Sequence, residues 1–161
     1  MIRFFGGRVM TLANGIETQD IEVWTEGSKI VFVGKPTAEE LDGKVFEREY
    51  DLKGNLLMPS FKNAHTHSAM TFLRSYADDM PLQDWLFKQI FPMEAKLDGE
   101  KVYWLTKLAI LEYLTTGCTA AFDMYFELDD YVKACVESGF RSVLCGAVSG
   151  DKSNLERLEN N

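Results

Sequence analysis

The sequence predicts an α/β protein in which a small N-terminal β-domain precedes the first about three βα units of an incomplete TIM (β/α)8 barrel. Two observations carry this prediction. Strand-like runs without helical periodicity fill residues 1–57. Strand-like and helix-like runs then alternate over residues 58–161, which is typical of parallel βα units. We therefore expect a β-domain over 1–57 and the start of a barrel over 58–161.

Residues 1–57 contain short strand-like runs separated by turn dipeptides. The stretch at residues 2–12 begins with a strand-like run, and further candidate strands are residues 21–24, 30–33 and 45–52. Asn14-Gly15 and Gly54-Asn55 are turn dipeptides. The loop at residues 26–29 contains Gly27 between two strand-like runs, which predicts a β-hairpin. The segment as a whole predicts a small antiparallel unit without helices.

Residues 58–161 repeat a pattern in which a helix, a glycine and a strand follow one another. The candidate strands are residues 61–67, 118–126 and 140–148, and the candidate helices are residues 82–91, 99–116, 128–138 and the start of one at 153–161. Pro92 should stop the first helix, because proline lacks the N–H and clashes with the preceding turn. Asp98 suits the N-cap of the second helix, and Gly117 and Gly139 suit the C-terminal ends of two helices. The apolar stripe of the second helix is wide, which predicts a largely buried helix.

The sequence is too short for a complete barrel. A complete (β/α)8 barrel needs about 250 residues, and this sequence has 161. We expect the N-terminal portion of a larger fold, ending where a fourth barrel strand would follow. An open sheet edge and uncovered helix faces should make residues 1–161 poorly soluble alone or assemble them into a homo-oligomer.

The composition excludes several classes of function. The formal net charge is −8, from 25 acidic and 17 basic residues, so the positive field that attracts nucleic acid is missing. No apolar run is long enough to span a membrane, and the N-terminus does not resemble a secretory signal. Cys118, Cys135 and Cys145 lack CxxC spacing and are expected to be small hydrophobic residues in a reducing cytoplasm.

Both histidines of the sequence lie two residues apart, at His65 and His67. Alternate residues of a strand project from one face, so the two imidazoles should share the face that also carries Phe61 and Asn63. Neutral imidazole is a good ligand for zinc or iron. The spacing alone also fits a polar strand end with satisfied hydrogen bonds. A catalytic zinc usually has three protein ligands, so further ligands would have to come from outside this sequence.

Several motifs together resemble the amidohydrolase superfamily. They are LMPSFKNAHTH at 57–67, SAMTFLR at 68–74, YADDMPL at 76–82, Trp85-Leu86, FPME at 91–94, TGCT at 116–119 and FDMY at 122–125. The branch that they resemble contains the 5-methylthioadenosine/S-adenosylhomocysteine deaminases and their chlorohydrolase-like relatives. The resemblance covers essentially the whole chain, which corresponds to the N-terminal portion of the family members, and it implies that residues 1–57 are part of a small β-sandwich.

This resemblance implies a hydrolase of C–N bonds in cyclic amidines that deaminates adenosine-type nucleosides with one Zn²⁺ or Fe²⁺ per site. His65 and His67 would be two metal ligands, whereas the other ligands and the catalytic proton shuttle are expected beyond residue 161. Glu94 would accept hydrogen bonds from the ribose hydroxyls, and Trp85 would lie against the substrate. Without the resemblance, Glu94 is an exposed carboxylate at a helix end, and Trp85 is a core aromatic residue.

Four other polar positions have simpler interpretations. Asp123 lies in an otherwise apolar strand and is either a support for the pocket or a satisfied polar group at a strand end. Lys62 lies on the strand face opposite the histidines, where its stem can extend to solvent. Arg74 and Asp78-Asp79 are interpreted as a local surface ion pair and a turn.

Two alternatives to an adenosine-type deaminase stay open. One is another amidohydrolase, such as a guanine or cytosine deaminase or a triazine chlorohydrolase-like enzyme. The other is a non-catalytic βα fragment that binds metal weakly or serves as an assembly surface. The number of metal ligands separates the enzymes from the fragment, because two histidines alone should bind zinc weakly.

Overall fold

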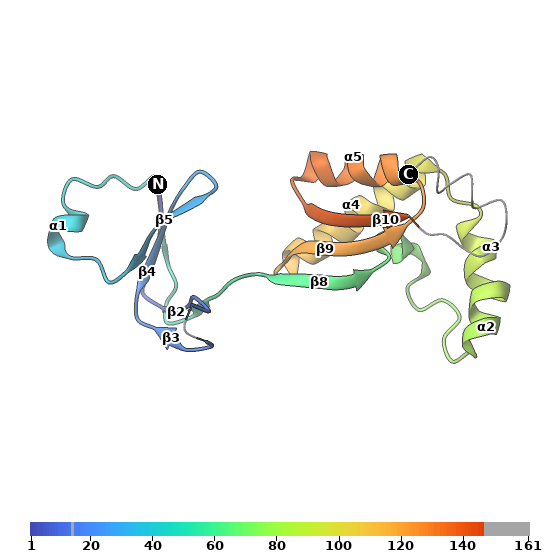
Figure 1. The fold of residues 1–161 in the computed structure, drawn as a ribbon, viewed down its shortest axis with the longest axis horizontal. Helices are drawn as coiled ribbons and strands as arrows, with labels where there is room; N and C mark the ends of the chain where they lie inside the picture. Colours follow the sequence, from blue (N-terminus) through green and yellow to red (C-terminus); the bar gives the residue numbers. More distant parts are fainter. Residues whose placement is uncertain (14, 147–161) are drawn as a thin grey trace. The chain divides into compact units, whose positions relative to one another are not determined.

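The computed structural model describes residues 1–13 and 15–146, and its contacts divide the chain into two compact units. The first unit is Met1–Pro59, and the second begins at Ser60. Strands and helices both occur, which confirms the predicted mixed α/β class (Figure 1). Asn14 and residues 147–161 lie outside the described residues, and so do the predicted turn at Asn14, the last residues of the strand predicted at 140–148 and the helix predicted at 153–161.

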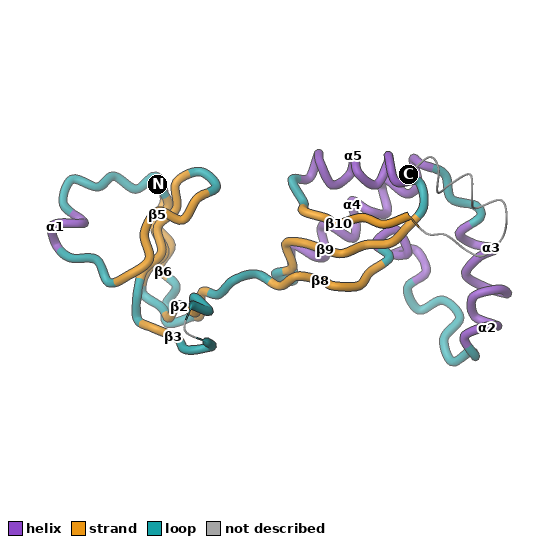
Figure 2. Tube along the Cα trace, in the orientation of Figure 1, coloured by secondary structure: helices purple, strands orange, loops and turns teal. Residues whose placement is uncertain are grey.

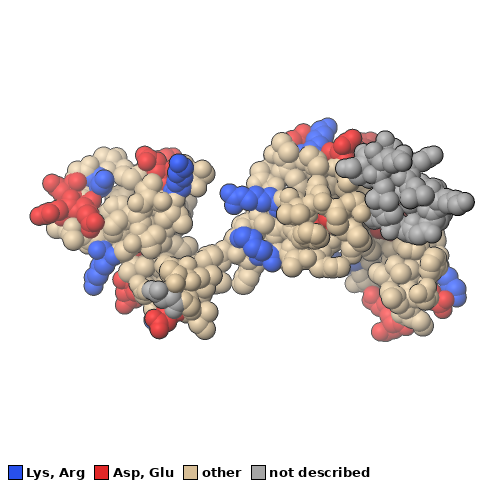
Figure 3. Space-filling view, in the orientation of Figure 1, with Lys and Arg blue, Asp and Glu red and all other residues tan. Residues whose placement is uncertain are grey.

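The described part of the first unit contains two small sheets. One has the strand order β5-β4-β1-β6, and the other has the order β3-β2-β7. The elements are β1 (Ile2–Phe5), β2 (Arg8–Met10), β3 (Thr18–Gln19), β4 (Glu22–Glu26), β5 (Lys29–Gly34), α1 (Ala38–Leu41), β6 (Arg48–Asp51) and β7 (Leu56–Leu57). Acidic side chains gather around α1, where Glu39 and Glu40 occupy the first turn (Figure 3).

The predicted hairpin is confirmed. Strands β4 and β5 pair antiparallel, and Gly27 between them has a φ of 57°, a conformation that glycine adopts without strain. Trp24 is buried on this hairpin and stacks on Phe32 with ring centroids 4.1 Å apart.

Two predictions for the first unit are wrong: that it is antiparallel and that it has no helix. Residues 2–12 hold two strands, β1 and β2, because the chain turns at Gly6-Gly7 and passes from one sheet to the other. A Cβ on Gly7 would lie 2.4 Å from the carbonyl oxygen of Asn55, so only glycine fits there. The unit is also not purely antiparallel, since β1 pairs with β6, and β2 with β7, in parallel. The short helix α1, which Thr37 caps at its N-terminus, was not predicted.

The second unit is built on a parallel sheet with the strand order β10-β9-β8 (Figure 2). Its elements are β8 (Phe61–Thr66), the 3₁₀ helix η1 (Ser68–Leu73), α2 (Leu82–Asp84), the π-helix η2 (Trp85–Ile90), α3 (Phe91–Glu94), α4 (Gly99–Thr115), β9 (Cys118–Tyr125), α5 (Leu128–Ser138) and β10 (Arg141–Gly146). Its core is a cluster of buried side chains from the helices and the sheet, which includes Val102, Ile110, Ala121 and Tyr131.

The ends of the two long helices follow the predicted chemistry. The Asp98 carboxylate accepts a hydrogen bond from the Lys101 N–H at 3.0 Å and caps α4. Gly117 directly follows the C-cap of α4 and has a φ of 83°. Gly139 is the C-cap of α5 and has a φ of 64°. Both are in the left-handed conformation that commonly ends a helix. Helix α5 spans the predicted residues.

Two predictions about the helices are wrong. Pro92 does not stop the helix that begins at Leu82, because the chain widens into η2 ahead of it. In η2 the Phe91 N–H donates to Leu86, five residues back, which moves the preceding turn away from the proline ring. Helix α4 is not largely buried: Trp104 is 61% exposed, and Leu108 and Leu111 are exposed as well, because the sheet, η1 and α5 cover one side of the helix.

None of the helices in residues 1–13 and 15–146 combines the length and the hydrophobicity that a membrane-spanning segment requires.

Candidate metal and substrate site

The two histidines lie together at the carboxyl end of β8. His65 is in the strand, and the His65 and His67 rings have centroids 5.0 Å apart with an interplanar angle of 83°. His67 was predicted within the strand but follows it directly, because Ser68 begins the tight turn η1. The structure therefore brings the two imidazoles side by side, although only one belongs to the strand.

The His67 ring is oriented by the neighbouring strand. Its Nδ1 lies 2.9 Å from the Met124 carbonyl oxygen on β9. A carbonyl oxygen only accepts hydrogen bonds, so Nδ1 carries the proton and donates. The remaining nitrogen, Nε2, then has a free lone pair. This is the arrangement in which a metal-binding histidine is held by its other nitrogen.

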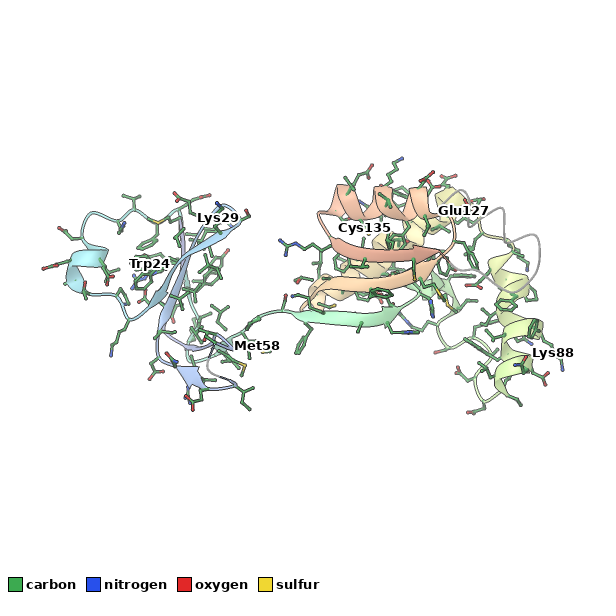
Figure 4. The ribbon with its side chains drawn as sticks, in the orientation of Figure 1. Trp24, Lys29, Met58, Lys88, Glu127 and Cys135 are labelled. Atoms are coloured by element: carbon green, nitrogen blue, oxygen red, sulfur yellow. The ribbon has the colours of Figure 1, made fainter. Side chains whose placement is uncertain are left out.

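A cavity of about 560 Å³ lies beside this strand end. Its walls come from the irregular helix over residues 82–94, from α4 and from the end of β9. The lining residues are His67, Met70, Trp85, Leu86, Ile90, Phe91, Glu94, Ala95, Leu97, Val102, Met124, Tyr125, Phe126 and Glu127. Figure 4 shows Glu127 where the chain leaves β9. Three of the four residues proposed from the sequence, His67, Glu94 and Trp85, thus line one cavity.

Glu94 is half-buried rather than an exposed carboxylate at a helix end. Burial raises the pKa of its carboxyl group above the ordinary value of 4.5, while Tyr125 and His67 act in the opposite direction. Tyr125 is 3% exposed, and its own pKa is raised by burial and by the charge of Glu94. Among the described residues, the Tyr125 hydroxyl has no hydrogen-bond partner of ordinary geometry. It lies near the Glu94 carboxylate, which influences its pKa.

The sequence did not single out Tyr125. It is the last residue of β9, two positions after Asp123 and at the same end of the sheet as His65. A polar tip on an aromatic residue at the carboxyl end of a parallel strand is the signal that could have indicated it.

Asp123 is fully buried at 0% exposure and accepts hydrogen bonds from several donors. The Tyr131 hydroxyl donates to Oδ2 at 2.6 Å, and the Ser68 backbone N–H lies 3.2 Å from the same oxygen. The Ser68 hydroxyl also donates to it. Burial, followed by the hydrogen bond to Asp123, raises the pKa of Tyr131. Asp123 is therefore a satisfied polar group, and its partners include the residue next to His67.

Two polar residues outside the cavity have other partners than expected. Arg74 pairs with Glu112 on α4 at 2.6 Å rather than with Asp78-Asp79, because η1 packs along that helix. Lys62 donates from Nζ to the Ser60 hydroxyl at 2.7 Å and to the Ser60 carbonyl at 3.1 Å. Neither contact reaches the histidines.

The donor set fits part of a metal site. Two imidazoles side by side, one with its Nε2 free, are suitable ligands for zinc or iron. Within residues 1–13 and 15–146, no group of three histidine, cysteine, aspartate or glutamate side chains is arranged to hold a metal ion. Cys118 and Cys135 are buried and Cys145 is half-buried, and all three are free thiols (Cys135 is labelled on α5 in Figure 4). The residues described here can supply two ligands.

Comparisons with known sequences agree on one family. Residues 56–161 match the sequence model of the amidohydrolase family. A 5-methylthioadenosine/S-adenosylhomocysteine deaminase of Desulfitobacterium hafniense is 42% identical over 136 residues, which are 84% of this chain and 31% of that protein. A 5′-deoxyadenosine deaminase of Methanospirillum hungatei is 52% identical over 108 residues, which are 66% of this chain and 24% of that protein. This chain spans about a third or less of the length of these relatives.

Comparisons with solved structures give the same fold. An adenosine deaminase from Xanthomonas campestris with bound zinc superposes with a TM-score of 0.84 at 32% identity, over 99% of this chain and 38% of that one. A variant of the atrazine chlorohydrolase from Arthrobacter aurescens superposes with a TM-score of 0.79 at 21% identity, over 96% of this chain and 37% of that one. The second likeness, at such low identity, shows the fold alone.

Proposed function

The chain belongs to the amidohydrolase family, and on that basis we propose that it is the N-terminal portion of a metal-dependent deaminase of adenosine-type nucleosides. The substrate class is 5-methylthioadenosine and S-adenosylhomocysteine. Relatives with these names are 40% and 42% identical to this chain, and the adenosine deaminase structure covers nearly all of it. The three free cysteines support a place in the reducing cytoplasm.

The fold part of this proposal is a barrel that this chain begins. Strands β8, β9 and β10 would be its first three strands, within a barrel segment over residues 58–161, and residues 1–57 would contribute to a β-sandwich. The parallel order of the sheet and the crossover helices α4 and α5 support this. The cavity at the carboxyl ends of β8 and β9 is where barrel enzymes place their chemistry.

The metal part of the proposal assigns His65 and His67 as two ligands of one Zn²⁺ or Fe²⁺. The bound zinc of the similar adenosine deaminase supports zinc. A metal ion at this place would lower the pKa of a bound water and supply hydroxide at neutral pH. The contribution of this chain is to present two imidazoles side by side at the end of β8, with His67 lining the cavity and its ring held by Met124.

The substrate part of the proposal assigns Glu94 and Trp85. A carboxylate has acceptors for both protons of a vicinal diol, so Glu94 would bind the ribose hydroxyls and fix the sugar. Trp85 would give the substrate an apolar surface, and Ile90 and Met70 would exclude water from the same cavity. The single observation that carries the function is that Glu94 and His67 line one cavity.

Another amidohydrolase is the second candidate. Guanine and cytosine deaminases and triazine chlorohydrolases act on compounds without a ribose, so a carboxylate that binds a diol has no partner there. A guanine deaminase from Clostridium acetobutylicum superposes with a TM-score of 0.71 at 18% identity, which supports a shared fold only. The half-buried Glu94 in the cavity favours a nucleoside.

The test uses the complete protein that contains residues 1–161, loaded with Zn²⁺ and assayed for ammonia release. We expect turnover of 5-methylthioadenosine and S-adenosylhomocysteine. Glu94→Gln should raise KM about 10–100-fold, because a hydrogen bond to a charged group contributes about 1.5–3 kcal/mol. The same variant should change KM little for 2′,3′-dideoxyadenosine, which lacks the diol.

Glu112→Gln is the matched control, because Glu112 is a carboxylate outside the cavity that pairs with Arg74. It should leave both KM values unchanged. Turnover of guanine or cytosine in place of the nucleosides would favour the second candidate. A metal-loaded complete protein that neither deaminates these compounds nor dechlorinates a chlorotriazine would leave only the non-catalytic alternative.

A further inference from the structure

Two consecutive residues at the end of β8 are bound by two consecutive residues of β9. His67 donates from Nδ1 to the Met124 carbonyl, and Ser68 donates its N–H to the Asp123 carboxylate. The Ser68 hydroxyl donates to the same carboxylate. The turn that carries His67 is therefore held to β9 through the His67 ring and through Ser68, which follows it.

Regular strand pairing does not fix this turn. The register of β8 against β9 shifts between Asn63 and Thr66, and Thr66 is the last residue of β8 to pair. Beyond Thr66, the hydrogen bonds of His67 to Met124 and of Ser68 to Asp123 take the place of backbone pairing. Thr66 itself is tied to α4 by a hydrogen bond of 2.5 Å between its hydroxyl and that of Tyr113, so the side chains continue the connection where the strand ends.

The Asp123 carboxylate is itself held in one place by its neighbours. It is 0% exposed, and Tyr131 holds it from α5 through a hydrogen bond of 2.6 Å. Tyr131 is in turn within 3.1 Å of the Ser142 hydroxyl on β10. A buried carboxylate with only donors around it has one favourable arrangement, so the atoms that donate to it are fixed as well.

We propose that Asp123 is a positioning residue for the metal ligand His67. Through Ser68 it keeps the His67 Nδ1–H on the Met124 carbonyl, which fixes one tautomer and leaves Nε2 as the metal-binding nitrogen. The assignment of Nε2 to a metal rests on the proposed function. The tautomer and its dependence on Asp123 do not, so the two parts fail separately.

The test is a nitrogen-15 NMR spectrum of the histidine rings at about pH 8, where an ordinary imidazole is neutral, in the metal-free form of the complete protein that contains residues 1–161. The His67 signals are the ring signals that His67→Gln removes. We expect a protonated Nδ1 and an unprotonated Nε2 for His67. A protonated Nε2 would overturn the inference at once.

Asp123→Asn keeps the size of the side chain and removes the carboxylate. We expect a mixture of His67 tautomers and Zn²⁺ binding by the histidine pair that is about 10–100-fold weaker, the usual effect of losing a partner behind a metal ligand. Tyr103→Phe is the control, because it removes a tyrosine hydroxyl that donates to the Glu137 carboxylate, outside the Asp123 network. It should leave the tautomer and the Zn²⁺ affinity unchanged.

If Asp123→Asn fails to fold, Ser68→Ala decides, since it removes the hydroxyl donor to Asp123 and leaves the buried carboxylate in place. We expect a partial mixture of tautomers in this variant. A single, unchanged His67 tautomer in folded Asp123→Asn, or in folded Ser68→Ala, would show that Asp123 does not position the ring. Deaminase activity plays no part in this readout, so a failure of the proposed function would leave it intact.

Discussion

Replacing Tyr131 with phenylalanine should destabilise the second unit by about 1.5–3 kcal/mol. Tyr131 is 0% exposed, and its hydroxyl donates to the buried Asp123 carboxylate at 2.6 Å. Phenylalanine keeps the ring and its packing, so the change removes one hydrogen bond to a charged group and creates no large cavity. The Asp123 carboxylate keeps its Ser68 donors, and Ser142 keeps its bond to the Ala121 carbonyl at 3.2 Å. The loss should therefore be that of one charge-assisted bond.

Tyr103→Phe is the matched control for this prediction. The Tyr103 hydroxyl also donates to a carboxylate, that of Glu137, at 2.5 Å, but this pair is exposed to solvent. Water can replace the lost partner there, so the variant should unfold like the wild type.

Urea unfolding followed by circular dichroism and tryptophan fluorescence measures both variants. We expect the midpoint for Tyr131→Phe to fall by on the order of 1 M urea at an unchanged slope. Equal midpoints for the two variants would refute the reasoning, because the buried hydrogen bond from Tyr131 to Asp123 would then stabilise the fold no more than the exposed one from Tyr103 to Glu137.

Three further predictions concern other parts of the structure. Burial raises the pKa of Glu94 above 4.5, so the folded state binds this proton more tightly and stability should fall as the pH rises from 4.5 through the raised pKa. Glu94→Gln should remove that decline, as unfolding curves over the acid range will show. Glu22→Gln should destabilise the first unit by about 1.5–3 kcal/mol, since Glu22 accepts two hydrogen bonds from Arg3 at 2.6 and 2.7 Å, and thermal unfolding measures the loss. Gly7→Ala should cost about 1–3 kcal/mol in the same measurement, because the new methyl group would meet the backbone carbonyl of Asn55.

Features that depend on near neighbours in the sequence were predicted well. Helix α5 is followed by Gly139, and α4 begins after the N-cap Asp98, so both helices carry their own end signals. The hairpin of β4 and β5 likewise needs only a short loop with Gly27. In each case one or two residues with special backbone or side-chain chemistry fix the boundary.

Features that depend on distant residues were not predicted. The parallel pairing of β1 with β6 joins segments more than 40 positions apart, and no local pattern specifies it. The apolar stripe of α4 shows that the helix has a hydrophobic side, but it cannot show that only part of that side is covered, with Trp104 left exposed. The burial of Glu94 depends in the same way on residues of α4 and β9 that line the cavity with it.

The widened turn before Pro92 explains how the sequence places Trp85 and Glu94 in one cavity. In a regular α-helix, nine positions at about 100° each would turn the two side chains to opposite sides, about 180° apart. The π-helix η2 absorbs one extra residue, which reduces the separation to that of eight positions, or about 80°. Trp85 and Glu94 then line the same cavity. The proline that should have ended the helix therefore accompanies the irregularity that aligns the proposed substrate residues, and a regular helix over residues 82–94 would move one of them out of the site.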